Sequence, residues 1–260
     1  MPIAALVTLG ASYAFPVAGL LAAVCGVALV GGVVAAVHHA EVVAQRIGEP
    51  FGTLALAVTA IETSLVISLI LGGGEHADVL VRDTVYATVM IIATGVIGLC
   101  ILLGSIRHRE QKFRIEGAGP AFAALAALAV LVLIMPAFAV SAPGATYTTS
   151  QLVFVAVCSL SLWCVFVFFQ TISHRDYFLP LGPLAGAAEH ALGLTVPVVV
   201  AVCIAFDLPI VLGVDAKDIA LLTLTLLVGA VGIGSGRTNL MYGAVQIVIF
   251  AAFLFLALVP

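Results

Sequence analysis

The sequence predicts an all-α polytopic membrane protein, and two observations carry this prediction. The first is composition: 63% of the 260 residues are hydrophobic and only 8% are charged, whereas a soluble domain carries about 25% charged residues. The second is that charged and turn-forming residues divide the chain into about eight apolar segments, each near the ~20 residues that a helix needs to cross a bilayer. No basic patch of the kind that binds nucleic acid is present.

These apolar segments are the expected transmembrane helices. Residues 1–37 carry no charge, and the first span runs over about 16–38, after a stretch long enough for a short or re-entrant helix. The uncharged stretch 117–173 is too long for one helix, and SAPGAT at 141–146 divides it into two. The remaining expected spans are 50–71, 84–106, 190–206, 219–236 and 238–260.

Basic residues predict the orientation, because cytoplasmic loops of membrane proteins are enriched in Lys and Arg. When the chain crosses the membrane at each span, most basic residues fall on one side: Arg46, Arg107, Arg109, Lys112, Arg114, Arg175 and Arg237, leaving Arg82 and Lys217 on the other. We therefore expect the loops 105–116 and 173–180 to be cytoplasmic. The loops 72–82 and 207–217 and the C-terminus are expected to be external.

Glu62 lies inside the expected span 50–71 with no Lys or Arg nearby. On a helix at about 100° per residue, small and hydroxyl side chains gather on one side of it: Gly48, Gly52, Ala55, Thr59 and Thr63. A charged side chain in the bilayer core costs several kcal/mol and commonly marks an ion or proton pathway. We predict that Glu62 binds a cation or a proton, with Thr59, Thr63 and Gly52 beside it. The structural alternative is a protonated Glu62 that only hydrogen-bonds to another helix.

Glu49 and Pro50 stand where this helix is expected to begin. Pro is acceptable in a first helical turn, and an acidic side chain is stabilised at the positive N-terminal end of a helix. The pair therefore marks either a vestibule of the ion pathway or a plain helix cap.

Three stretches occur in a recognisable order: HHAEVVAQRIGEPFGTLALAVTAIETSL at 38–65, RDTVYATVMIIATGVIG at 82–98 and GSGRTN at 234–239. Together they resemble bacterial calcium/proton antiporters of the Cha type, in the calcium/cation antiporter superfamily. The resemblance covers 38–175 and resumes at about 192. It implies a ten-helix core of two inverted five-helix repeats after an extra N-terminal helix. It also implies that Glu62 is the ion- and proton-binding carboxylate of the first repeat.

The chain departs from that pattern in the second repeat, where the family carries another membrane glutamate. The corresponding stretch 174–197 reads HRDYFLPLGPLAGAAEHALGLTVP, so about two spans and an acidic linker are missing. We interpret 1–260 as a single membrane domain. It contains a first repeat region at 38–175, with a preceding helix from about 16, and a truncated second repeat at 181–260.

Two further carboxylates are candidates for the site. Glu189 lies near the place of the missing second glutamate; it supplies that carboxylate or caps a helix at the cytoplasmic surface, and the flanking LGPLAGAA favours the surface. Asp83 follows Arg82 at the start of a span. It is a vestibule ligand or a solvated ion pair, and the ion pair is favoured.

The predicted function is secondary active transport that exchanges a cation (calcium, or sodium or potassium) for protons, with Glu62 as the shared carboxylate. The alternative is an internally deleted relative that does not transport; more remote is an intramembrane enzyme, since no histidine faces the Gly-Ser-Gly of GIGSGR. We expect no resident cofactor and no enzymatic activity. The expected location is the bacterial cytoplasmic (inner) membrane. The expected partners are lipid, cations and protons but no nucleic acid, and a homo-oligomer is left open.

Overall fold

A computed structural model describes residues 77–112, 115–140, 144–173, 184–206 and 210–259, and six isolated helical positions before residue 77. The chain divides into two compact units, Met1–Leu56 and Ala57–Pro260. The six positions belong to the first unit, and every element below belongs to the second. Apart from four of those positions, the predicted spans 16–38 and 50–71 lie outside the described residues.

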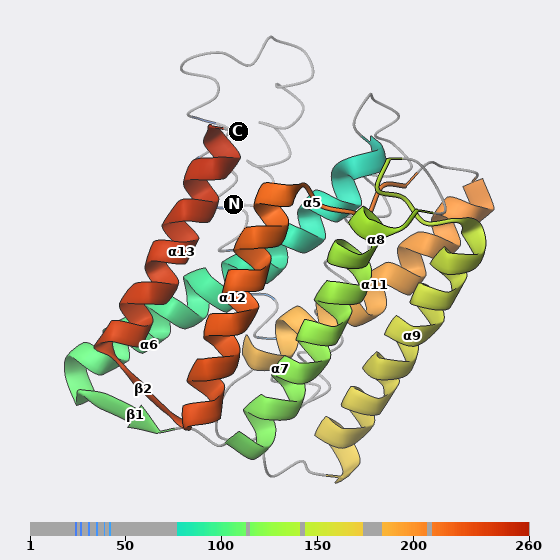
Figure 1. The fold of residues 1–260 in the computed structure, drawn as a ribbon. Helices are drawn as coiled ribbons and strands as arrows, with labels where there is room; N and C mark the ends of the chain where they lie inside the picture. Colours follow the sequence, from blue (N-terminus) through green and yellow to red (C-terminus); the bar gives the residue numbers. More distant parts are fainter. Residues whose placement is uncertain are drawn as a thin grey trace. The chain divides into compact units, whose positions relative to one another are not determined.

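The described part of the second unit is a bundle of helices with one small pair of strands (Figure 1). In chain order the elements are α5 (Ala77–Met90), η2 (Ile91–Val96), α6 (Ile97–His108), β1 (Glu110–Lys112), α7 (Ile115–Ala129), η3 (Val130–Ile134), α8 (Met135–Phe138), α9 (Thr149–Phe168), η4 (Phe169–Ser173), α11 (Leu184–Phe206), α12 (Ala216–Ser235), β2 (Arg237–Asn239) and α13 (Leu240–Leu258). The segments η2, η3 and η4 are π-helical turns that continue the helices before them.

Five helical stretches in the described residues are long and apolar enough to cross a membrane: Val79–Arg107, Ile115–Phe138, Thr149–Ser173, Ala216–Ser235 and Leu240–Leu258. They correspond to the predicted spans 84–106, the two halves of 117–173, 219–236 and 238–260. The prediction of an all-α polytopic membrane protein is therefore confirmed, while the total of eight spans stays a prediction. The predicted span 190–206 is part of the longer helix α11.

The GSGRTN stretch ends one membrane helix and begins the next. Gly236 ends α12 with φ of 63°, a left-handed conformation that glycine adopts without steric cost. Arg237–Asn239 then forms β2, and the side chain of Asn239 accepts a hydrogen bond of 3.0 Å from the backbone N–H of Tyr242 at the start of α13. The stretch is therefore a compact reversal of the chain direction between α12 and α13.

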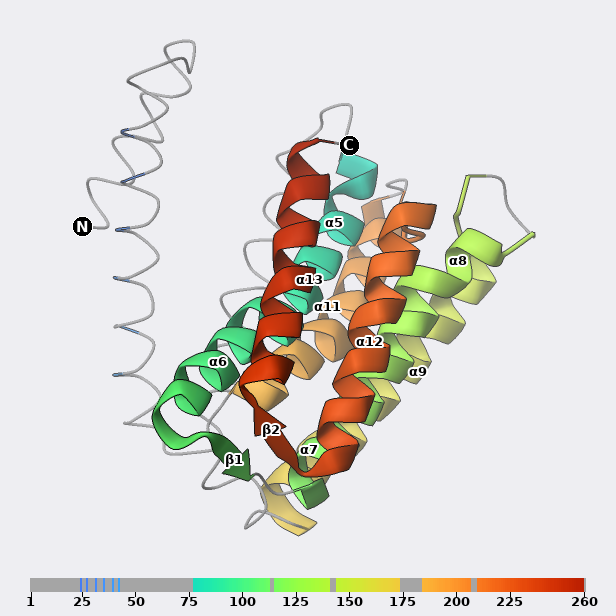
Figure 2. The same cartoon turned by 60° about the vertical axis from the view of Figure 1, so that its left-hand side comes forward.

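Contacts between distant parts of the sequence tie each end of the bundle. At one end, β1 pairs antiparallel with β2, with Lys112 opposite Arg237. At the other end, Nη1 of Arg82 donates a 3.3 Å hydrogen bond to the carbonyl oxygen of Gly213. Figure 2 shows the strands at one end and the start of α5 at the other. The loop 105–116 therefore lies at the same end of the bundle as Arg237, and Arg82 lies at the same end as the loop 207–217, as predicted.

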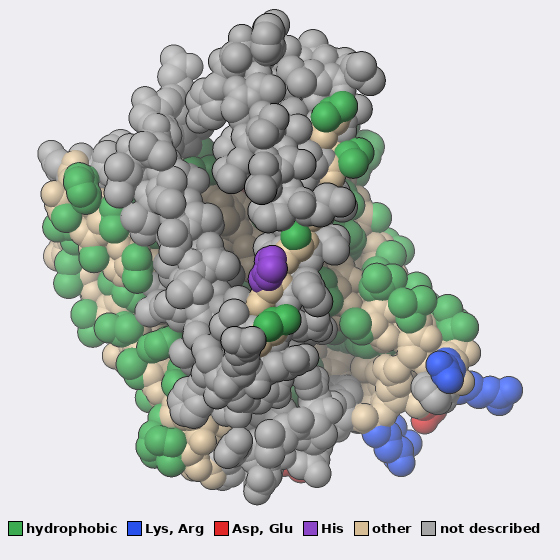
Figure 3. Space-filling model, turned by 180° about the vertical axis from the view of Figure 1, so that it is seen from behind, with side chains coloured by type: hydrophobic (Ala, Val, Ile, Leu, Met, Phe, Trp, Pro, Cys, Tyr) green, Lys and Arg blue, Asp and Glu red, His purple; other side chains and the backbone are tan. Residues whose placement is uncertain are grey.

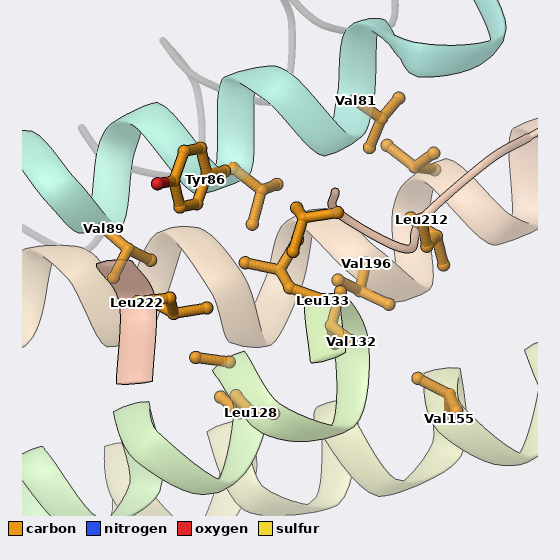
Figure 4. Close-up of a cluster of buried hydrophobic side chains, with 14 of the residues drawn as sticks. Val81, Tyr86, Val89, Leu128, Val132, Leu133, Val155, Val196, Leu212 and Leu222 are labelled. Atoms are coloured by element: carbon orange, nitrogen blue, oxygen red, sulfur yellow. The ribbon is translucent and has the colours of Figure 1, made fainter. Parts of the chain in front are cut away.

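The core of the bundle lies between α5, α7, α11 and α12, with contributions from α9 and α13 (Figure 4). The largest fully buried side chains in it include Met90, Leu128, Leu133 and Leu222, each 0% exposed. Burial of such a side chain stabilises the fold by about 1.5–3 kcal/mol in water. Helix α11 contacts both α9 and α7, and α12 contacts α7.

The outer surface of the described helices is also apolar. Phe154, Val165 and Phe255 are each more than 60% exposed. Charged side chains occur instead at the helix ends, and Figure 3 shows described Lys and Arg side chains gathered at one end of the molecule. A helix that is apolar on all sides can pack against protein with one face and contact lipid tails with the other. The apolar outer surface is therefore what a protein embedded in a bilayer requires.

Helices α6 and α13 approach so closely that glycine is required at their contact. A Cβ atom on Gly243 would lie 2.7 Å from the backbone nitrogen of Leu102, and one on Gly98 would lie 2.7 Å from Cβ of Gln246. Small residues at such contacts allow the backbones of membrane helices to meet.

We predict that Gly243→Ala lowers the free energy of unfolding by about 1–3 kcal/mol, because the new methyl group meets backbone atoms that cannot rotate away. The matched control is Gly234→Ala in α12, where an added Cβ has nothing within 4 Å. Thermal unfolding of the two detergent-solubilised variants provides the comparison. Equal stabilities would contradict the close contact.

We predict that an impermeant thiol reagent added outside the cell modifies a cysteine at position 215 but not one at position 110, in a chain whose native cysteines have been replaced. Both positions are exposed, at opposite ends of the bundle. The reason is the excess of basic residues at the strand end, which is retained on the cytoplasmic side. The reverse labelling pattern would invert the orientation.

Candidate functional site

Most of the predicted ion site falls outside the described residues. This holds for Glu62, Thr59, Thr63, Gly52 and Glu49. Their roles therefore remain predictions.

Glu189 lies within the first two turns of α11, whose backbone is described while this side chain is not. The helix begins at Leu184, earlier than the predicted span. The Gly- and Pro-containing stretch before Glu189 is thus partly helical.

Asp83 forms an ion pair at the end of the bundle. Its Oδ1 atom accepts a 2.8 Å hydrogen bond from Nε of Arg82, and its side chain is 59% exposed. An exposed pair of this kind contributes about 0–1 kcal/mol. This is the arrangement that the sequence favoured for Asp83, and the second contact of Arg82, with Gly213, gives the pair a role in joining α5 to the segment before α12.

Polar side chains inside the described bundle are few and mostly hydroxyls. Those that are buried are Thr94, Ser105, Ser159, Thr195, Thr225, Thr238 and Gln246. Thr94 donates to the carbonyl oxygen of Met90 at 2.5 Å, and Thr225 donates to that of Leu221 at 2.9 Å. A threonine bonded to its own helix is satisfied without a ligand, so these two need no ion to account for them.

A polar network in the membrane part links α12 to α13. The hydroxyl of Tyr242 donates to the carbonyl oxygen of Val228 at 2.7 Å, and Nε2 of Gln246 donates to that hydroxyl at 3.2 Å. Gln246 is 2% exposed, and its Oε1 atom has no partner among the described residues. We did not single out this network from the sequence, although Gln246 is the most polar side chain between Asn239 and the C-terminus.

The described residues contain no group of three or more His, Cys, Asp or Glu side chains that could hold a metal ion. A calcium ion takes 6–8 oxygen ligands, usually with more than one carboxylate. The part of the bundle that the structure shows therefore supplies hydroxyl, amide and carbonyl oxygens but no ready divalent-cation site.

The sequence from 17 to 172 matches the model of one family, described as sodium/calcium exchanger protein. The chain belongs to this family of calcium/cation exchangers. The match includes the predicted ion-binding stretch around Glu62 and the helices from α5 to the end of α9. With its apolar helices, the chain is a multi-pass membrane protein of the ion-transporting, antiporter type.

Two relatives support the assignment. The chain is 33% identical to a Sinorhizobium fredii (strain NBRC 101917 / NGR234) protein named as an ionic transporter, y4hA, over 89% of this chain and 87% of the relative. It is 34% identical to the sodium-potassium/proton antiporter ChaA of Escherichia coli (strain K12), over 68% of this chain and 49% of ChaA. Both relatives carry the names of transporters.

The alignment with y4hA also bears on the missing segment. It extends over 318 positions, whereas 89% of the 260 residues of this chain is only about 231 residues. About 87 aligned positions of the relative therefore have no counterpart here.

Proposed function

We propose that this protein exchanges a monovalent cation for protons, with Glu62 as the carboxylate that both ions share. The observation that carries the proposal is a carboxylate inside a predicted membrane span, with small and hydroxyl residues at helical spacing from it, in a stretch that matches the exchanger family. An ionisable residue in that setting is expensive to keep and commonly belongs to an ion pathway.

Coupling follows from competition at one group. The carboxylate of Glu62 holds a proton or a cation at a given moment, but not both. If Glu62 is exposed alternately to the two sides of the membrane, a cation released on one side is replaced by a proton, which then travels the opposite way. Thr59 and Thr63 supply further oxygens to the cation, and Gly52 allows a neighbouring helix to approach.

Charge balance favours sodium or potassium as the cation. A single carboxylate neutralises a monovalent ion, whereas a calcium ion beside one carboxylate keeps a net positive charge in a medium of low dielectric constant, where unbalanced charge is costly. The name of the relative ChaA, a sodium-potassium/proton antiporter, points the same way. Calcium becomes the substrate only if Glu189 supplies a second carboxylate.

A second candidate is a chain that has lost transport through its internal deletion. It is favoured by the y4hA alignment, in which about 87 positions of the relative have no counterpart in this chain. The resemblance implies a second membrane glutamate in the second repeat, and the stretch expected to carry it is missing here. Cation-induced dissipation of a pH gradient by the parent protein distinguishes an active exchanger from a chain that has lost transport.

We predict that Glu62→Gln abolishes cation-induced dissipation of an imposed pH gradient in everted vesicles. The amide keeps the size and hydrogen bonding of the side chain but cannot carry the charge for which cation and proton compete. A pH-sensitive dye reports the gradient while sodium, potassium or calcium chloride is added in turn. Glu110→Gln in the exposed strand β1 is the control and is expected to respond as the parent does. No response of the parent to any cation would favour the deleted, non-transporting candidate.

We predict that Glu189→Gln leaves the sodium and potassium responses unchanged, because one carboxylate is sufficient for a monovalent ion. The same vesicles and dye serve as the measurement. If instead the parent responds to calcium and Glu189→Gln removes that response, Glu189 belongs to the ion site and the substrate is divalent.

A further inference from the structure

A groove of about 400 Å³ lies between α12 and α13. Its walls are apolar side chains one helical turn apart on each helix: Leu227 and Val231 on α12, Met241 and Val245 on α13. Residues at positions i and i+4 of a helix share one face, so each helix presents one continuous wall. Leu227, Val231 and Met241 are each more than 60% exposed, so none of the described helices covers these walls.

Tyr242 and Gly232 line the groove where the two helices meet. A Cβ atom on Gly232 would collide with the ring carbon Cζ and the hydroxyl oxygen of Tyr242, so the ring lies against α12 only because residue 232 has no side chain. The Tyr242 hydroxyl already donates to the carbonyl oxygen of Val228 at 2.7 Å. This part of the groove therefore offers an apolar surface whose polar group is satisfied within the protein, which suits a hydrocarbon chain.

One end of the groove is polar, because Ser235, Arg237 and Asn239 line it at the turn between the helices. From Ser235 back to Leu227 the groove follows two turns of α12, about 12 Å at a rise of 1.5 Å per residue. Figures 1 and 2 show this turn, with β2, at the strand end of the bundle, and α12 and α13 running from it side by side. The groove thus leads from the charged end into two helices that are apolar enough to cross a membrane. A molecule with a polar head and an apolar tail matches that polarity.

The two strands hold basic side chains together at the polar end of the groove. In β2 the buried residue is Thr238, so Arg237 and Asn239 take the opposite, exposed face, because side chains alternate along a strand. In β1, Lys112 is paired with Arg237 and is exposed as well. Directly paired residues of an antiparallel ribbon have Cβ atoms about 4.5–5.5 Å apart, and like charges at such positions destabilise the pairing. Two positive charges therefore stand close together there.

Within the described residues, these two charges are not neutralised. The ion pair found there is that of Arg82 with Asp83, at the other end of the bundle. Glu110, the acidic residue of the ribbon, forms no ion pair with another described residue. An anion bound between Lys112 and Arg237 relieves their repulsion, and the planar guanidinium group of arginine is suited to a phosphate.

We propose that the groove between α12 and α13 binds an anionic phospholipid, with one acyl chain along its apolar walls and the phosphate between Arg237 and Lys112. The side-chain nitrogen of Asn239 is a further donor at this end, since its oxygen already accepts from the N–H of Tyr242. In the predicted orientation the headgroup belongs to the cytoplasmic leaflet, which carries a negative surface potential. The bound lipid joins α12 and α13 to β1 and so stabilises the packing of the bundle. This site goes beyond the exchange function and does not depend on it.

The test is thermal unfolding of the full chain in a neutral detergent, with no transport involved. Phosphatidylglycerol is titrated into the micelles, and phosphatidylcholine or inorganic phosphate replaces it in matched samples. A ligand that binds only the folded state raises the midpoint. We expect a rise that saturates with phosphatidylglycerol, and no such rise with phosphatidylcholine or with phosphate alone.

Two charge variants test the contact with the headgroup. Arg237→Gln and Lys112→Gln are each expected to raise the apparent Kd for phosphatidylglycerol about fivefold, the equivalent of the about 1 kcal/mol that one basic side chain contributes near an anionic lipid. Both side chains are exposed, so both variants are expected to fold, and either one decides the matter if the other does not. The matched control is Arg107→Gln, which removes the same charge at an exposed position of α6 outside the groove. It is expected to leave the Kd unchanged.

A second pair of variants tests the contact with the acyl chain. Val231→Trp places an indole ring in the groove and is expected to raise the Kd by at least as much as the loss of one charge, because the ring occupies the space of the chain. Val248→Trp on α13 is the matched control. Val231 and Val248 are 68% and 67% exposed, but Val248 does not line the groove, and its replacement is expected to leave the Kd unchanged.

Several outcomes overturn the proposal: no saturating shift in the parent, an equal shift with phosphatidylcholine or inorganic phosphate, an unchanged Kd in both charge variants or in Val231→Trp, or equal weakening in Arg107→Gln. The last result would reduce the effect to a general attraction between basic residues and anionic micelles. Light scattering in the same detergent tests a second copy of the chain as the occupant. A dimeric parent that Val231→Trp converts to a monomer would overturn the lipid site and assign the groove to that interface.

Discussion

The helices of this protein are apolar on the faces that meet one another and on the faces that meet lipid, so burial of apolar surface does not by itself select a neighbour. In a bilayer, close backbone approach and a few polar contacts make that selection. Gly98 and Gly243 bring α6 and α13 together at backbone distance. Tyr242 joins α13 to α12 through the Val228 carbonyl. The remaining core side chains fill the space that these contacts define.

Polar contacts also select the neighbours at the two ends of the bundle, where they involve strand pairing and a charged side chain and not glycines. Exposed backbone is tolerated outside the hydrocarbon region, and there β1 and β2 pair and bring Lys112 opposite Arg237. At the other end, Arg82 connects α5 to Gly213 before α12. These contacts fix which helix ends lie together, and they give the molecule one basic end and one end of mixed charge.

The distribution of carboxylates connects this architecture to transport. Family membership and the matched relatives make the chain a multi-pass exchanger-type protein. Placing a carboxylate inside such a bundle costs several kcal/mol unless it is protonated or meets a cation. That alternative between proton and cation is the physical basis of the antiport that we propose at Glu62.

The membrane class, five of the helices and the sharing of sides by distant loops were predictable from the sequence. Apolar length and the placement of charges are local properties that the bilayer converts directly into spans. The predicted span began at 190, whereas α11 begins six residues earlier, at Leu184. The prediction that Glu62 binds ions also comes from the sequence alone, because a carboxylate in an apolar run is visible without any structure.

The polar partners of the bundle were decided only by the tertiary structure. Tyr242 of α13 finds its hydrogen-bond partner, the Val228 carbonyl, on α12, and Gln246 in turn donates to the Tyr242 hydroxyl. Neither contact can be read from the segment that carries the residue. Periodicity assigns a residue to a face of its own helix, but the neighbour on that face depends on how the helices pack. In a chain that is apolar on every face, that choice is made by contacts between helices.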